Sequence, residues 1–282
     1  MNFNKLNTSE LDKDLSPEER AEWNAIYASY RAGSMLSGEI SGIDRYAISD
    51  DKKTLAAVII NYRVKILIPE KLLWEDSENV PKTTTKNLLG AKIDFVIQEI
   101  DRENNICVAS RIAALKIRRR QFFNSNPKVG DLIKLNILAV GIKRVIVETN
   151  GFDLRLSRRE LCYSAIPDFR MNYGAGQTLT AIIKEVDKKE NKLLVSVRES
   201  KPHPYIGIKK RHPVDSRRAS VIINKYKGSI FCKLEDDYDC LCNYSQYQHD
   251  DDFEIGGKVV IVIKEFDDKH KRVYGVIVSK WR

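Results

Sequence analysis

A threefold internal repeat constrains the fold of this 282-residue chain more than any other feature of its sequence. Three segments begin with a glycine, continue as an extended apolar run, and end with Glu, one apolar residue and Asp. They cover residues 90–101, 176–187 and 256–267. A repeat of this kind predicts consecutive copies of one structural unit.

Each copy of the repeat predicts a β-hairpin. A polar turn follows the final Asp, and a second apolar run follows the turn at residues 106–109, 193–197 and 273–278. β-branched residues fill the runs and charged residues fill the turns, which is typical of two strands joined by a short connection.

Further candidate strands lie upstream of each hairpin. Segments 64–68, 152–156 and 238–242 alternate so that successive side chains point to opposite faces. The other candidates cover 36–43, 54–60, 132–140, 145–148, 220–226 and 229–234. Each unit therefore has five predicted strands, as in a small five-stranded barrel.

Two helices are predicted outside the strands. The first begins at Ser16, which forms a capping box with Glu19, and its apolar side chains at Trp23, Ile26, Tyr27 and Tyr30 share one stripe. We expect this helix to pack on the first barrel; the alternative is that it docks on a partner machine such as a ribosome or RNA polymerase. The second helix is a basic connector over residues 110–123.

These motifs resemble the S1-type RNA-binding domain of ribosomal protein S1 and its divergent homologues. The resemblance rests on the repeated hairpin, on the strand ending Leu156-Ser157, and on the strand exit Ser196-Val197-Arg198. It predicts a mainly β fold of three tandem five-stranded OB-type barrels, with an N-terminal α-helix and a short helical connector. The predicted parts are an N-terminal helical segment (1–33), a first barrel with its connector (34–123), a second barrel (124–205) and a third barrel (206–282).

The resemblance implies binding of single-stranded RNA by aromatic side chains that stack on bases and basic groups that follow phosphates. On the third strand the family places an aromatic residue and then a histidine on the binding face. The matching pairs here are Lys65 and Leu67, Asp153 and Arg155, and Asp239 and Leu241. The sequence therefore favours binding by charge over binding by stacking.

The charge of the chain supports this interpretation, because its formal net charge is +9 and basic side chains release counterions from phosphates. The predicted RNA contacts lie on the middle barrel, the connector and the first barrel. They are Lys143, Arg144, Arg155, Arg158, Arg159, Lys184, Arg198, Arg118, Arg119, Arg120 and Lys65. The alternative is that these are ordinary solvated side chains.

The third barrel differs from the second in its charge. Acidic residues crowd segments 235–239 and 250–254, which predicts that this surface repels phosphate and docks a protein instead. An acidic loop that faces solvent explains the same residues.

The sequence contains no P-loop, Rossmann fingerprint, HExxH helix or nucleophile elbow, so we expect no enzymatic activity and no cofactor. No metal site is predicted: His249 beside an acidic loop is a weak candidate, and Cys240 and Cys242 are expected on the core face of a strand. The longest apolar run, 55–60, is far shorter than the roughly 20 residues that span a bilayer. Five cysteines without a CxxC pair favour a cytoplasmic location.

Two functions remain open from the sequence. The first is single-stranded RNA binding by a translation or transcript-handling accessory factor. The alternative is a structural or assembly protein that uses its barrels as protein-interaction modules in a larger complex.

Overall fold

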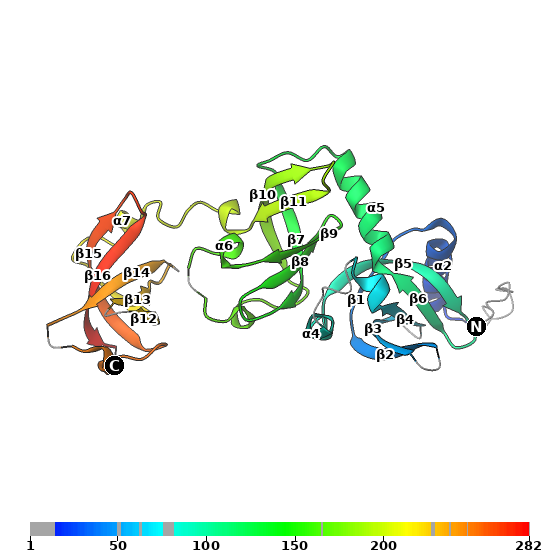
Figure 1. Ribbon diagram of the computed structural model, residues 1–282, viewed down its shortest axis with the longest axis horizontal. Coiled ribbons are helices and arrows are strands. Elements are labelled where there is room, and N and C mark those ends of the chain that lie inside the picture. Colours follow the sequence, from blue (N-terminus) through cyan, green and yellow to red (C-terminus); the bar gives the residue numbers. More distant parts are fainter. Residues whose placement is uncertain are drawn as a thin grey trace. The chain divides into compact units, whose positions relative to one another are not determined.

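The computed structural model of the protein describes residues 15–49, 52–61, 64–75, 82–164, 166–226, 229–236, 238–246 and 248–281. Within these ranges the chain is mainly β, and its strands form three closed or nearly closed barrels (Figure 1). The second and third have five strands each, and the first has six because the strand predicted at 36–43 is divided between β1 and β2. The predicted fold class is confirmed. Residues 1–14 of the predicted N-terminal segment, and Asp237 of the acidic group, lie outside the described residues.

The first barrel has the strand order β1-β5-β6-β4-β3-β2. Its strands are β1 (Leu36–Glu39), β2 (Gly42–Ser49), β3 (Lys52–Asn61), β4 (Val64–Pro69), β5 (Lys92–Asp101) and β6 (Ile106–Ser110), with short helices α3 (Glu70–Leu73) and α4 (Lys82–Lys86). The strand predicted at 36–43 is interrupted after β1. There the Ile40 amide donates to the Ala91 carbonyl and the Ser41 amide to the Val58 carbonyl, both at 2.9 Å, so one bent segment bonds to both sides of the barrel.

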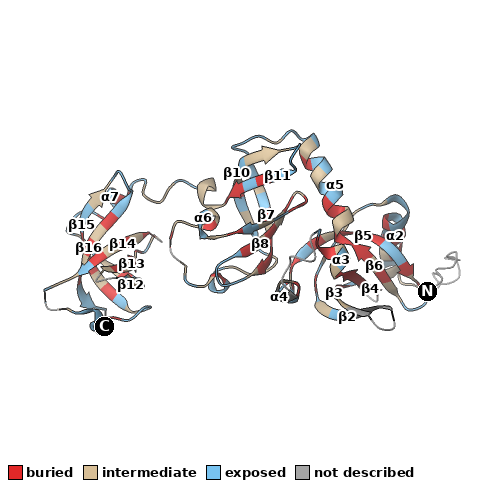
Figure 2. Ribbon diagram, in the orientation of Figure 1, coloured by how far each residue is buried: buried red, intermediate tan, exposed pale blue. Residues whose placement is uncertain are grey.

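The second and third barrels repeat this arrangement. The second contains β7 (Leu132–Val140), β8 (Val145–Thr149), β9 (Phe152–Leu156), β10 (Thr178–Asp187) and β11 (Lys192–Ser196), in the order β11-β10-β7-β8-β9. The third contains β12 (Arg217–Tyr226), β13 (Ser229–Lys233), β14 (Asp239–Tyr244), β15 (Lys258–Asp267) and β16 (Arg272–Lys280), and it is closed. Buried residues alternate with half-buried ones in β8 and along most of β14 (Figure 2).

Short helices complete these barrels. They are α6 (Arg158–Leu161), α7 (Ile208–Arg211) and the 3-10 turns η1 (Phe169–Met171), η2 (Arg198–Ser200) and η3 (Asp250–Asp252).

The repeated segments are β5, β10 and β15, each of which begins two residues after its repeat glycine and ends at its repeat aspartate. Gly90, Gly176 and Gly256 have φ values of +81°, +80° and +90°, a conformation that favours glycine. The aspartates accept backbone N–H groups of the following turn, as in the bond from the Asn104 amide to Asp101 at 3.2 Å. The repeat therefore marks the two ends of one strand.

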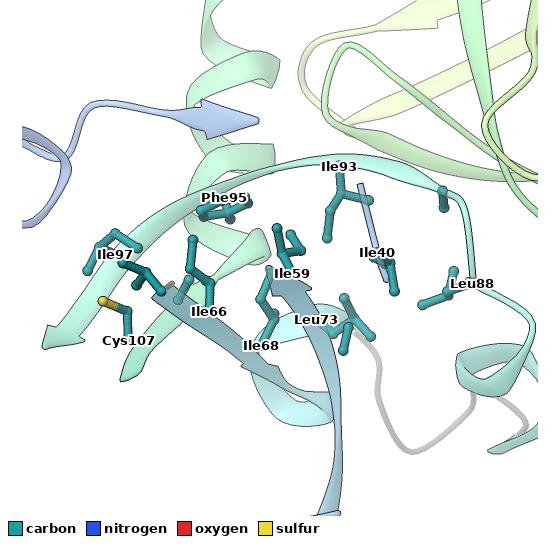
Figure 3. Packing of buried hydrophobic residues seen from close by; sticks show 14 of the residues in the cluster. Ile40, Ile59, Ile66, Ile68, Leu73, Leu88, Ile93, Phe95, Ile97 and Cys107 are labelled. Atoms are coloured by element: carbon teal, nitrogen blue, oxygen red, sulfur yellow. The ribbon is translucent and has the colours of Figure 1, made fainter. Parts of the chain in front are cut away.

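The N-terminal helix α2 (Pro17–Ala32) packs on the first barrel. Ser16 and Glu19 form the predicted capping box, and Gly33 caps the C-terminal end of the helix. Trp23, Ile26 and Tyr27 are buried in the same cluster as the barrel interior, part of which Figure 3 shows around Phe95 and Ile66. The apolar stripe is thus covered by the barrel, although Tyr30 is 45% exposed and lies outside the packed surface.

Two compact units emerge from the contacts along the chain. The first comprises the described residues before Leu156 together with Arg170–Leu194, and the second comprises Leu156–Phe169 together with the described residues from Val195 onward. The domain boundaries at 33, 123 and 205 stay a prediction. Within the described ranges, no helix is both long enough and apolar enough to cross a membrane.

Candidate nucleic-acid interface

The connector helix α5 (Arg111–Asn124) joins the first barrel to the second inside the first unit. Its first residue, Arg111, is 1% exposed and holds both oxygens of Asp153, with distances of 2.8 Å from Nη1 and 2.5 Å from Nη2. The same Nη1 donates to the Leu73 carbonyl at 3.1 Å. Because Leu73 belongs to the first barrel and Asp153 to β9, this arginine ties the two barrels together.

Gly151 lets the turn between β8 and β9 reach the helix. A Cβ atom at this position would lie 2.2 Å from the Leu115 carbonyl oxygen, and the residue has a φ of +87°. Arg119 donates to the Gly151 carbonyl through Nε at 3.2 Å and through Nη2 at 2.7 Å. The same Nη2 reaches Glu75 at 2.8 Å, and the guanidinium lies 4.8 Å from the ring centroid of Phe152.

Two of the three predicted connector arginines are therefore engaged within the unit. Arg118 donates to Asp94 at 2.6 Å, and Arg119 is shared between Glu75 and Gly151. Arg120 is exposed on the helix. Arg118 and Arg119 thus belong to the joint between the barrels, where their charge is matched by carboxylates.

A hollow of about 400 Å³ opens beside this joint. We name it the joint hollow; its lining is Trp74, Glu75, Arg119, Ile146, Phe152, Asp153, Leu154, Arg155, Asn191, Lys192 and Leu193. It lies over β8, β9 and the turn from β10 to β11, which is the surface on which OB-type barrels bind oligonucleotides. All of its lining residues belong to the first unit.

Arg155 is the predicted site residue that the joint hollow presents most openly. It is exposed on β9, and no hydrogen bond or ion pair joins its side chain to the residues the structure describes. Lys192 is exposed at the start of β11 and pairs with Glu185 at 2.7 Å. Asn191 adds an amide beside it. These groups make one rim of the hollow basic and polar.

The remaining predicted residues are dispersed. In the first unit, Lys143 and Arg144 are exposed in the β7–β8 turn, Lys184 is exposed on β10, and Lys65 pairs with Asp44 at 2.8 Å. Arg158, Arg159 and Arg198 belong to the second unit. Arg158 and Arg159 are exposed on α6, and Arg198 lies 5.1 Å from the ring centroid of Tyr163.

Glu148 is an acidic residue near the contact between the two barrels, and its pKa differs from the ordinary value. Burial raises the pKa of Glu148, against the lowering effects of the bond from the Gly151 amide at 2.9 Å and of the nearby Arg111 charge. The neighbouring Asp153 belongs to the pair with Arg111. Glu148 and Asp153 thus have their partners, the Gly151 amide and Arg111, within the first unit.

Sequence reasoning missed Trp74, Asn191 and Lys192. Trp74 follows α3 and is 4% exposed. It lies 81 positions before Arg155 in the chain, and no local sequence pattern links the two residues. Asn191 and Lys192 had a usable signal, because they occupy the turn of the second repeat. In the third barrel the strand after the matching turn, β16, pairs with β14, the strand that matches β9.

No metal centre is apparent: among the residues described, no group of three or more His, Cys, Asp and Glu side chains is placed to hold an ion. Cys240 and Cys242 are fully buried in the third barrel, as predicted, with Sγ atoms 3.6 Å apart. Cys232 joins them in the same core.

Comparison with known proteins gives distant matches. No family model matches the chain. The small ribosomal subunit protein bS1 of Neisseria meningitidis is 20% identical over 263 residues, which cover 90% of this chain and 45% of that protein. Proteins of the same name from Pseudomonas aeruginosa and Coxiella burnetii match over a similar extent. The chain is S1-like.

The S1-like chain spans less than half the length of these relatives. A shorter match, 23% identical over 192 residues, is to a 4-hydroxy-3-methylbut-2-enyl diphosphate reductase of Clostridium tetani, of which it covers 30%. Among solved structures, a multidomain protein with nucleic acid binding domains from Streptococcus pneumoniae aligns with 87% of this chain and 73% of its own, at 10% identity and a TM-score of 0.23.

Proposed function

We propose that this chain binds single-stranded RNA as a non-enzymatic translation or transcript-handling accessory factor, and that the joint hollow is its main phosphate contact in the first unit. The observation that carries the proposal is the exposed Arg155 on β9, at the oligonucleotide-binding face of the second barrel and beside Lys192.

The chemistry of this rim suits a phosphate backbone. A guanidinium is always charged and presents a fixed fork of N–H donors to phosphate oxygens. The backbone of Arg155 is held on a regular strand, so the barrel sets the point from which its exposed side chain extends before RNA arrives. A site formed in advance loses less conformational freedom on binding than a flexible basic tail does.

The distant S1 relatives support this proposal at a coarser level, because their names place them in the small ribosomal subunit. The proposal for this chain adds the place of contact and the mode of binding. It makes charge the main source of affinity in the first unit, since the third-strand position of the family's aromatic residue holds Asp153, which is bound to Arg111.

The experiment that tests the proposal is RNA binding by fluorescence anisotropy with the full chain, over salt concentrations from about 50 to 200 mM. Arg155→Ala should weaken binding for every RNA sequence and reduce the salt slope by about 1. The matched control is Arg217→Ala, which removes an exposed arginine from β12 of the third barrel. Equal loss in both variants would contradict a site at the joint hollow.

The alternative, an assembly protein, has its own supporting observation. Asp251, Asp252 and Glu254 are exposed before β15, and the charges of Arg118 and Arg119 are matched within the first unit. An assembly protein does not need free basic groups for RNA. Absence of RNA binding by the full chain at about 50 mM salt would favour this function.

A further inference from the structure

A second hollow, of about 410 Å³, lies in the second unit over β13, β14 and the turn from β15 to β16. We name it the aromatic hollow. In the third barrel it takes the place that the joint hollow has in the second, because the segment from Tyr238 to Leu241 matches the segment from Phe152 to Arg155 in the repeat. Its chemistry is different.

Aromatic rings dominate the wall of the aromatic hollow. Tyr163 and His203, which lie outside the strands of the third barrel, have ring centroids 4.3 Å apart at an interplanar angle of 57°. His203 lies 6.4 Å from Tyr238 of the barrel, and Phe231 of β13 adds a fourth ring to the lining. Tyr163, His203 and Phe231 are half-buried, so part of each ring is open to the hollow.

Basic groups border the same rings. Lys271 and Arg272 are exposed in the β15–β16 turn and line the hollow, and Arg198 lies over Tyr163. Burial lowers the pKa of His203, and the charges of Lys271 and Arg198 lower it further, which favours the neutral imidazole. Asp239 also lines the hollow and brings one negative charge to it.

Of the two acidic segments of the third barrel, 250–254 is separate from this surface, whereas 235–239 contributes Asp239 to the lining. Asp250, at the start of η3, bonds to Tyr244 and pairs with Lys225 at 2.9 Å, and the segment does not line the aromatic hollow. At the hollow itself, the single carboxylate of Asp239 is accompanied by the basic side chains of Lys271 and Arg272.

We propose that the aromatic hollow takes one unpaired nucleobase of bound RNA, which stacks against Tyr163 and His203 while Lys271 and Arg272 contact the flanking phosphates. This inference rests on the proposed function and deepens it: the joint hollow supplies charge, and the aromatic hollow supplies stacking. Aromatic rings accept any base on their faces, so the site discriminates single strands from duplexes rather than one sequence from another.

The test compares two oligonucleotides with the full chain: a single-stranded RNA and an abasic strand of the same length and charge. The wild-type chain should bind the base-bearing strand about tenfold more tightly, the usual scale for stacking of one base on protein aromatics. The double variant Tyr163→Leu with His203→Leu should lose this preference and keep the salt slope. Tyr163→Phe should retain it, and Tyr226→Leu, which replaces an exposed tyrosine outside the hollow, is the matched control.

A second measurement needs no variant. Ultraviolet cross-linking of 4-thiouridine RNA to the wild-type chain, followed by mass spectrometry, should identify peptides that contain residue 163 or 203. Equal binding of both strands by the wild-type chain, or cross-links only outside these peptides, would overturn the aromatic hollow and leave the phosphate contact intact. Failure of the wild-type chain to bind either strand would overturn the proposed function itself.

Discussion

Asp153 stands where the S1-type pattern places an aromatic side chain on the third strand, and its carboxylate is committed to a buried arginine. Arg111 is 1% exposed, and burying a guanidinium is costly unless a counter-charge and hydrogen-bond acceptors surround it. Asp153 supplies the charge, and the Leu73 carbonyl supplies a further acceptor. At this position, Asp153 therefore binds Arg111 instead of offering an aromatic ring for stacking.

Replacing Asp153 by alanine should destabilise the first unit by about 3 kcal/mol, because Arg111 would remain buried without its counter-charge. Urea unfolding followed by circular dichroism measures this change. The matched control is Asp44→Ala, which breaks the exposed pair with Lys65 and should change stability little. Similar stability of both variants would show that the pair of Arg111 with Asp153 does not hold the two barrels together.

Glu148 makes the stability of the first unit depend on pH, and the sign of this dependence follows from its raised pKa. Its pKa is raised by burial, so the folded chain binds a proton at this group more readily than the unfolded chain does. Its contribution to stability is therefore full below the ordinary glutamate pKa and is lost as pH rises through the raised value.

Glu148→Gln removes this titration and keeps an oxygen that can accept the Gly151 amide. The melting temperature of the variant, relative to wild type, should be higher at pH 8 than at pH 5. The wild-type chain measured at the same two pH values cancels the contribution of all other carboxylates. A difference that does not depend on pH would contradict the raised pKa.

At the scale of elements, α5 not only connects the first two barrels in sequence but also packs against both of them. Its sequence predicts an exposed basic helix, but four of its residues are buried: Arg111, Ala114, Leu115 and Phe122. The β8–β9 turn lies directly against it at Gly151. A helix that touches both barrels restricts their relative motion, whereas a flexible linker would leave each barrel free.

Gly151→Ala should weaken this contact by more than the ordinary cost of a side chain at positive φ, which is about 1–2 kcal/mol. The added methyl group would overlap the Leu115 carbonyl, so either the turn or the helix has to move. Gly130→Ala is the matched control, because Gly130 has a φ of +99° and a Cβ atom added there would have no neighbour within 4 Å. Thermal unfolding of both variants measures the difference, and equal losses would refute close packing of the turn on α5.

At the scale of the whole molecule, the first barrel and most of the second belong to one unit. Leu138 and Ala139 of the second barrel are buried in the cluster that forms the first barrel's core. The repeat glycines also meet, since a Cβ atom on Gly176 would lie 2.5 Å from the Gly90 carbonyl oxygen. The second barrel therefore depends on the first for part of its burial.

A fragment of residues 124–205 should be less stable than a fragment of residues 15–205, because it exposes Leu138 and Ala139 and leaves Asp153 without Arg111. We expect its melting temperature to be lower by at least about 10 °C, on the usual relation between stability and melting temperature for a domain of this size. Circular dichroism melts of the two fragments measure this. Equal melting temperatures would mean that the barrels fold independently.

Local chemistry in the sequence was enough to predict most of the strands, the two longer helices and the fold class, whereas most of β2 and the short helices were not predicted. Gly90, Gly176 and Gly256 favour a left-handed backbone, Asp101 organises its turn, and Ser16 caps a helix through atoms three residues away. These effects act within a few residues, so they can be read from the order of amino acids alone. The burial of Cys240 and Cys242 followed from strand alternation in the same way.

Only the tertiary structure decided which charged side chains are committed to partners within the fold. Arg118 and Arg155 look alike in the sequence, but one is paired with Asp94 and the other is exposed at the joint hollow. Tyr163 and His203 likewise meet only through folding. The physical reason is that a charge or a ring acts on whatever lies within a few ångströms, and the folded chain brings those neighbours from distant positions.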